Sequence, residues 1–223
     1  MGHFSGTCLG VASGITLTVS GYVGLTMARE FTQAEADRHN AITAKGWALT
    51  DGRLLLQSQQ PSERLGWCTR WKLRRAARCF ERALEINPDG WSSMWALGKI
   101  HQRLGDQTLA FAWFAKAHAF KPDQPDVARE AGIAALDIGR VEDALALCRA
   151  AVVLSPGDPG LLANLALAYC LAGEDAEAER CAAEAVYRNR NDCVSATVLG
   201  FVRDVASEVR ERPKSLSLYG SKF

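Results

Sequence analysis

The chain has 223 residues, of which 48% are hydrophobic and 23% are charged, and this composition excludes wholesale disorder. At most one segment is apolar over enough residues to cross a bilayer, so a membrane protein with several spanning helices is excluded as well. The formal net charge is +1, from 26 basic and 25 acidic residues, so any attraction to nucleic acid or to an acidic membrane requires a local patch.

Residues 1–30 are a glycine-rich segment with no charged side chain before Arg29. Glycines recur every four residues, and small residues at that spacing suit helix pairing in lipid. The lack of a basic region before the apolar residues argues against a cleaved signal peptide. Three interpretations stay open: a membrane-associated helix over residues 2–28, a packed or strand-like extension, and a disordered or non-native leader.

An internal period of 34 residues is the strongest pattern in the remaining sequence. Placed in register, small residues form one column at Ala76, Ala110, Ala144 and Ala178. Two further columns contain Gly105, Gly139 and Gly173, and then Pro88, Pro122 and Pro156. We expect each glycine to end a first helix, because a left-handed residue costs least as glycine. Each proline is expected to follow a second helix. The period therefore predicts stacked pairs of helices.

This pattern resembles the tetratricopeptide repeat (TPR), whose 34 residues carry W-x2-L-G-x2-Y, then A-x3-F, then P. One copy reads Met94-x2-Leu97-Gly98-x2-His101, Ala110-x3-Phe114, Ala117 and Pro122. The resemblance covers about residues 71–206. It implies an all-α fold, a right-handed α-solenoid of about four helix pairs with a C-terminal capping helix.

The resemblance also predicts how the chain is organised after the N-terminal segment. In the first repeat we expect helices over Gln33–Leu49 and Trp71–Asn87, a helix-ending turn at Gly52-Arg53, and a partly looped insertion. The expected segments are a degenerate first repeat with that insertion over 31–90, three regular repeats over 91–192, a capping helix over 193–211 and a disordered tail over 212–223.

Family resemblance further implies a concave groove lined by the first helix of each pair. The register places these residues in it: Trp95, Lys99, Gln102, Arg103, Arg129, Ile133, Asn164, Leu167, Leu171, Thr197 and Phe201. The groove is expected to be basic at its N-terminal end and apolar towards its C-terminal end. An extended or helical peptide with an acidic group and apolar anchors would suit such a surface. The alternative is that these are ordinary helix-surface residues without a ligand.

A second candidate surface is a basic stretch with interleaved tryptophans at residues 67 and 71. Its cations are Arg64, Arg70, Lys72, Arg74, Arg75 and Arg78. Such a stretch could bind phosphates and stack on bases or sit at a lipid headgroup boundary. The favoured alternative is a solvated helix face with Trp71 packed inward. An acidic protein surface is the leading functional partner, and nucleic acid is the weaker one.

No residue pattern in the chain points to catalysis, a cofactor or a metal, so we expect a protein that is not an enzyme. The seven cysteines are odd in number and none has CxxC spacing, which argues against a disulfide framework or a structural zinc site. We expect them to be buried small hydrophobic residues in a reducing compartment.

The main functional hypothesis is an interaction module that binds a protein segment in its groove, as an adaptor, chaperone or assembly factor. The alternative is a membrane-tethered assembly protein anchored through residues 2–28, and RNA binding through the basic stretch is weaker still. The expected location is the cytoplasm, with membrane association if the N-terminus is an anchor. Self-association through Phe201 and Val205 stays open.

Overall fold

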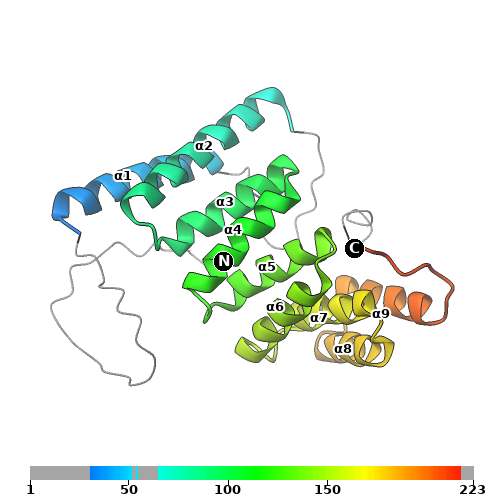
Figure 1. Cartoon of the computed structure of the whole chain (residues 1–223). Helices are drawn as coiled ribbons and strands as arrows, with labels where there is room; N and C mark the ends of the chain where they lie inside the picture. Colours follow the sequence, from blue (N-terminus) through cyan, green and yellow to red (C-terminus); the bar gives the residue numbers. More distant parts are fainter. Residues whose placement is uncertain (1–30, 52–53, 55–64, 217–223) are drawn as a thin grey trace, which may run out of the picture.

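The computed structural model describes residues 31–51, 54 and 65–216. Within these residues the secondary structure is entirely helical. The helices are α1 (Gln33–Thr50), α2 (Trp67–Ile86), α3 (Trp91–Leu104), α4 (Gln107–Phe120), α5 (Pro125–Asp137), α6 (Val141–Leu154), α7 (Pro159–Ala172), α8 (Asp175–Arg188) and α9 (Cys193–Ala206). They form four antiparallel pairs that stack along the chain, with α9 packed on the last pair (Figure 1). The predicted α-solenoid is confirmed.

The turns between the paired helices α3–α4, α5–α6 and α7–α8 contain a left-handed glycine, as predicted. Gly105, Gly139 and Gly173 have φ values of 89°, 75° and 84°, in the left-handed region that glycine tolerates best. After Gly105, the amide of Asp106 donates to the carbonyl of His101, which satisfies one of the last carbonyls of α3. The next helix therefore starts within two residues and folds back on the first.

Helices cross closely because small residues occupy the crossing points. A Cβ atom added to Gly98 would lie 2.5 Å from the ring of Phe114 on α4. One added to Gly132 would lie 2.8 Å from the Sγ atom of Cys148 on α6. The buried core that results is continuous from α4 through α9.

The first helix of the first repeat, α1, differs from the regular first helices at both of its ends. Thr32 and Glu35 form a capping box at the start of α1. At its other end α1 stops at Asp51, whose φ and ψ of −49° and 125° are not left-handed. The expected turn at Gly52-Arg53 and most of the insertion lie outside the described residues, as do residues 1–30.

The C-terminal part differs from the prediction in two places. Helix α9 ends at Ala206, so the capping helix is shorter than the expected 193–211. The disorder expected from residue 212 is wrong for 212–216, because these residues pack back on α5 and α7. Leu216 keeps only 7% of its surface exposed. Residues 217–223 lie outside the described part of the chain.

Candidate functional site

An exposed tryptophan pair lies at the N-terminal end of the groove. The Trp47 ring of α1 is 5.0 Å from the Phe80 ring and 6.4 Å from the Trp95 ring, measured between centroids. Trp47 is 40% exposed and Trp95 is half-buried. The register had assigned Trp95 but not Trp47, because the insertion after α1 breaks the 34-residue period. Gly46 could have indicated the register of α1, because it packs on Phe80 in the same way that Gly98 packs on Phe114.

Lys99 is not the free groove cation that the register predicted. Its side chain is 5% exposed, and its Nζ atom lies 3.1 Å from Oε2 of Glu130, itself 7% exposed. Nζ also lies 5.9 Å from the Trp95 ring centroid. Burial of an ion pair in this way makes Lys99 part of the α3–α5 packing. Sequence reasoning missed Glu130, although the register placed Asn164, at the same repeat position 34 residues later, in the groove.

Arg129 is likewise paired with carboxylates. Its Nη2 atom is 2.8 Å from Asp126 and 4.0 Å from Glu130. Nearby, burial and then the charge of Glu130 raise the pKa of Asp137 to about 6. Carboxylates therefore neutralise Lys99 and Arg129, and this end of the groove carries less positive charge than the sequence predicted.

Arg103 differs from the other two groove cations. It is half-buried near the end of α3, and its Nε atom is buried without a hydrogen-bond partner among the described residues. A buried donor without a partner is costly, and this Nε atom is shielded from solvent, so a docking acidic group could meet only the other guanidinium nitrogens. Gln102, Ile133 and Asn164 are half-buried as well.

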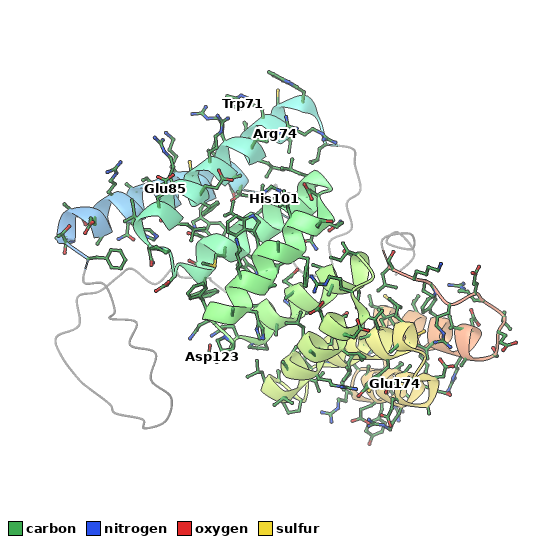
Figure 2. The ribbon with its side chains drawn as sticks, in the orientation of Figure 1. Trp71, Arg74, Glu85, His101, Asp123 and Glu174 are labelled. Atoms are coloured by element: carbon green, nitrogen blue, oxygen red, sulfur yellow. The ribbon has the colours of Figure 1, made fainter. Side chains whose placement is uncertain are left out.

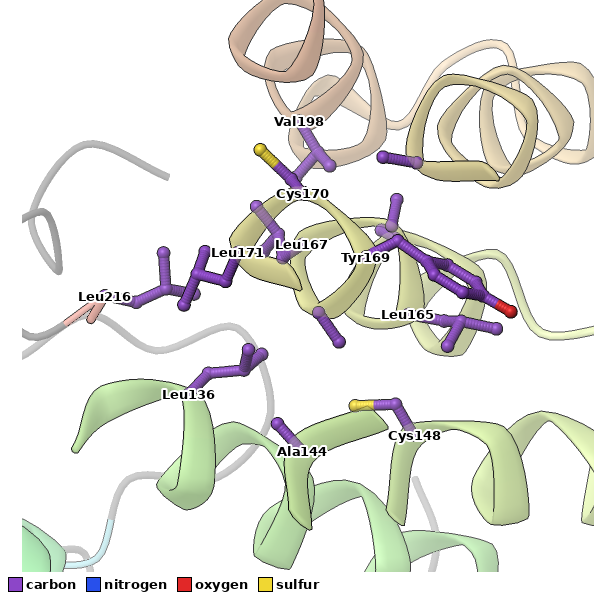
Figure 3. Close-up of a cluster of buried hydrophobic side chains, with 14 of the residues drawn as sticks. Leu136, Ala144, Cys148, Leu165, Leu167, Tyr169, Cys170, Leu171, Val198 and Leu216 are labelled. Carbon is purple, nitrogen blue, oxygen red and sulfur yellow. The ribbon is translucent and has the colours of Figure 1, made fainter. Parts of the chain in front are cut away.

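The predicted apolar end of the groove is mostly covered. Leu167, Leu171 and Phe201 are all buried, while Thr197 is exposed. Figure 3 shows Leu216 from the C-terminal segment beside Leu171 and Leu136. The predicted groove residues that stay at least partly exposed are therefore Trp95, Gln102, Arg103, Ile133, Asn164 and Thr197.

The outer face of α2 carries the second candidate surface. Trp67 is 77% exposed and Trp71 44% exposed, and the Arg75 guanidinium lies 4.7 Å from the Trp71 ring centroid. Inward packing of Trp71 was therefore wrong. The remaining described cations of this face are Arg70, Arg74 and Arg78, which are exposed, and Lys72, which is half-buried; Arg64 lies outside the described residues. Figure 2 labels Trp71 and Arg74 on α2, and Arg74 borders a hollow that α2 shares with His101 and Leu104 of α3.

The cysteines match their prediction only in part. Cys148, Cys170 and Cys181 are buried, and burial raises the pKa of the Cys148 thiol to about 12 and that of Cys170 to about 11. Such thiols remain protonated and are not nucleophiles. Cys68 and Cys193, by contrast, are exposed free thiols.

The described residues contain neither a metal-binding cluster nor a membrane-spanning helix. In that part of the chain, three or more His, Cys, Asp or Glu side chains nowhere gather in a way that could hold a metal ion. In the same residues, each helix is too short or too polar to cross a membrane.

The stacked helix pairs and their inner groove define the class of protein as an α-solenoid. The tetratricopeptide repeat model matches residues 72–125 and 116–159. Residues 72–159 therefore consist of tetratricopeptide repeats. This repeat generally forms an interaction scaffold without catalytic activity.

Solved structures share the fold at low sequence identity. MamA of Desulfovibrio magneticus RS-1 superposes with a TM-score of 0.63 at 17% identity, covering 77% of this chain and 86% of that one. PilF of Pseudomonas aeruginosa gives 0.57 at 20% identity, covering 79% and 72%. YrrB, described as a TPR protein with an unusual peptide-binding site, gives 0.55 at 18% identity, covering 68% and 84%.

One curated protein also matches, over a shorter stretch. The 131 kDa subunit of transcription factor tau from Saccharomyces cerevisiae is 28% identical over 75 residues. This stretch is 34% of the present chain but only 7% of the yeast protein.

Proposed function

We propose that this protein is a non-catalytic interaction module that binds a segment of a partner protein in its concave groove, as an adaptor, chaperone or assembly factor. The observation that carries the proposal is the Trp47–Trp95 pair at the open end of the groove. Tryptophan is enriched where binding energy is concentrated, because it offers a large apolar face and one polar atom.

The groove chemistry describes the segment that would bind. Apolar anchors pack on Trp47, Trp95 and Ile133, which line the open part of the groove. An acidic group would pair with the accessible part of the Arg103 guanidinium, since this side chain is only half-buried. Lys99 and Arg129 supply little attraction because carboxylates already pair with them. Apolar contacts therefore dominate the proposed affinity.

A matched pair of tryptophan substitutions tests this proposal. Trp47→Ala removes an exposed ring beside the groove, whereas Trp67→Ala removes a more exposed ring from the outer face of α2. Both variants and the unmodified chain are used as bait in affinity purification with mass spectrometry. We expect partners to be retained by Trp67→Ala and lost by Trp47→Ala. The same set on all three baits, with melting curves unchanged, would place binding outside the groove.

The exposed outer face of α2 supports a second candidate, binding of an acidic protein surface. The specific observation is that two tryptophans and three arginines are exposed there instead of packing inward. Arg74→Glu with Arg78→Glu should then release partners that Trp47→Ala retains. Capture that disappears after nuclease treatment would point to RNA, and binding only to anionic vesicles would point to a membrane surface.

We further place the protein in a reducing compartment such as the cytoplasm. Cys68 and Cys193 support this, because exposed free thiols are prone to oxidation elsewhere. The anchoring of residues 2–28 in a membrane is a prediction that lies outside the described residues.

A further inference from the structure

The C-terminal segment leaves α9 through a turn that reverses its direction. The amides of Ser207 and Arg210 donate to the carbonyls of Arg203 and Asp204. Glu208 has a φ of 58°, a left-handed conformation that a glutamate rarely adopts. The turn sends residues 212–216 back across α7 towards α5, which is visible as the red segment in Figure 1.

Arg212 fixes the first part of this segment. Its Nη1 and Nη2 atoms lie 2.8 and 2.9 Å from the two carboxylate oxygens of Asp175, so the pair is bidentate. Nη1 also donates to the carbonyl of Cys170 at the end of α7. The Arg212 hydrogen bond lowers the pKa of Asp175 below its usual value. One guanidinium thus joins the end of α7 to the start of α8.

Four residues later, Leu216 fixes the second part. Its amide donates to the carbonyl of Leu136 at 3.0 Å, and its side chain joins the core beside Leu171 (Figure 3). Between the two anchors the backbone lies close to the turn after α5. A Cβ atom on Gly139 would be 2.5 Å from the carbonyl oxygen of Lys214.

These contacts are those of a bound peptide ligand. An extended segment uses one main-chain hydrogen bond, one charged anchor and two buried apolar residues, Pro213 and Leu216, as peptides do in recognition grooves. The surface that receives it consists of Leu136, Gly139, Cys170, Leu171 and Asp175, and is called the tail strip below. Leu171 was also predicted as a groove residue, so the tail strip borders the groove.

We propose that the tail strip is a docking site for an extended protein segment carrying an arginine and, four residues later, a leucine, and that residues 212–216 are its resident, displaceable occupant. This inference rests on the proposed function, because the partner segment enters the same groove. The partner displaces the chain's own segment and gains the apolar end of the groove.

The balance of contacts makes such displacement reasonable. The Arg212 and Asp175 side chains are 34% and 35% exposed, and exposed ion pairs contribute little net affinity. The resident segment is also tethered to α9, and a short link gives an effective concentration of about millimolar that a partner has to exceed. A partner that also contacts the Trp47–Trp95 end has additional contacts that the resident segment lacks.

A labelled peptide with the sequence of residues 207–216 tests the tail strip directly. The full chain carrying Arg212→Glu and Leu216→Asp should have the strip open, and Lys214→Glu is the matched control because Lys214 is exposed. We expect at least tenfold tighter peptide binding by the opened chain than by the unmodified chain or the control. Equal binding by all three chains, or binding by none, would overturn the proposal.

Hydrogen exchange at the Leu216 amide provides a second measurement. We expect protection in the unmodified chain and in Lys214→Glu, and fast exchange of the residue 216 amide in the chain with Arg212→Glu and Leu216→Asp, which removes both side-chain anchors. Exchange as fast as in an unfolded peptide in the unmodified chain would contradict docking. Partner capture by the Trp47→Ala bait tests the groove, whereas peptide binding and hydrogen exchange test the tail strip. Failure of one proposal is therefore distinguishable from failure of the other.

Discussion

Single small residues set how closely the helices of this solenoid approach each other. Gly98 and Gly200 occupy the same position of the 34-residue register, yet their surroundings differ. Gly98 faces Phe114 of α4, whereas nothing lies within 4 Å of a Cβ atom added to Gly200. The difference arises because, up to residue 216 where the described part of the chain ends, no second helix follows α9. The same residue is therefore structurally required in one place and not in the other.

Alanine substitutions at Gly98 and Gly200 test whether the close helix crossing requires glycine. Gly98→Ala forces the Phe114 ring to move, and we expect a loss of about 1–3 kcal/mol in the free energy of unfolding. Gly200→Ala fits into open space in a helix, so a gain of about 0.5–1 kcal/mol is expected. Chemical denaturation of both variants measures these changes. Equal effects on the two would show that the register does not determine the packing.

The buried Lys99–Glu130 pair gives a second prediction at the level of residues. Lys99→Met leaves the Glu130 carboxylate buried with only Arg129 nearby, and should cost about 3–5 kcal/mol. The double variant Lys99→Met with Glu130→Leu should recover most of this loss, because neither charge remains. A double-mutant cycle from urea unfolding measures the coupling. Additive effects of the two substitutions would rule out a direct interaction.

At the level of elements, aspartates start several helices. Asp106, Asp158 and Asp192 precede α4, α7 and α9, and each side chain accepts a hydrogen bond from a backbone amide two or three residues later. These bonds satisfy amides that have no partner inside the helix. Each aspartate therefore marks where a helix begins after a turn.

Asp192 is the best test of this role, because α9 closes the solenoid. We expect Asp192→Ala to lower the free energy of unfolding by about 1 kcal/mol and Asp192→Asn to lower it less. The pKa of Asp192 is lowered from 3.8, first by the Ser195 hydroxyl and also by two backbone amides. Its contribution is thus present above pH 4 and is lost as the pH falls through the lowered pKa. Thermal melts at a series of pH values from 7 to well below 3.8 check both statements; a difference between the original chain and Asp192→Asn that does not shrink towards the lowest pH would contradict them.

For the whole molecule, the repeat register predicted most of the fold. The turns at Gly105, Gly139 and Gly173 and the close crossings at Gly98 and Gly132 all follow from a period that local backbone rules explain. The register of α1 was missed because an insertion separates it from α2. Repeat patterns carry such information only while the spacing is kept.

The candidate site was less predictable, because its character depends on contacts between distant residues. Lys99 looked like a free cation until Glu130, 31 residues away, was placed beside it. The predicted apolar end of the groove is covered in part by the C-terminal segment, whose Arg212 pairs with Asp175, 37 residues away. Neither contact repeats with the 34-residue period, so the pattern that revealed the fold contained no information about them.

Photo-crosslinking tests the central claim, that a partner segment lies in the concave groove, most directly. A photoreactive residue is placed at Gln102 on α3 in one chain and at Tyr187, exposed on α8, in another. The account predicts that a captured partner crosslinks through position 102 and not through position 187. Crosslinking through position 187 alone would contradict it and place the working surface on the outside of the solenoid.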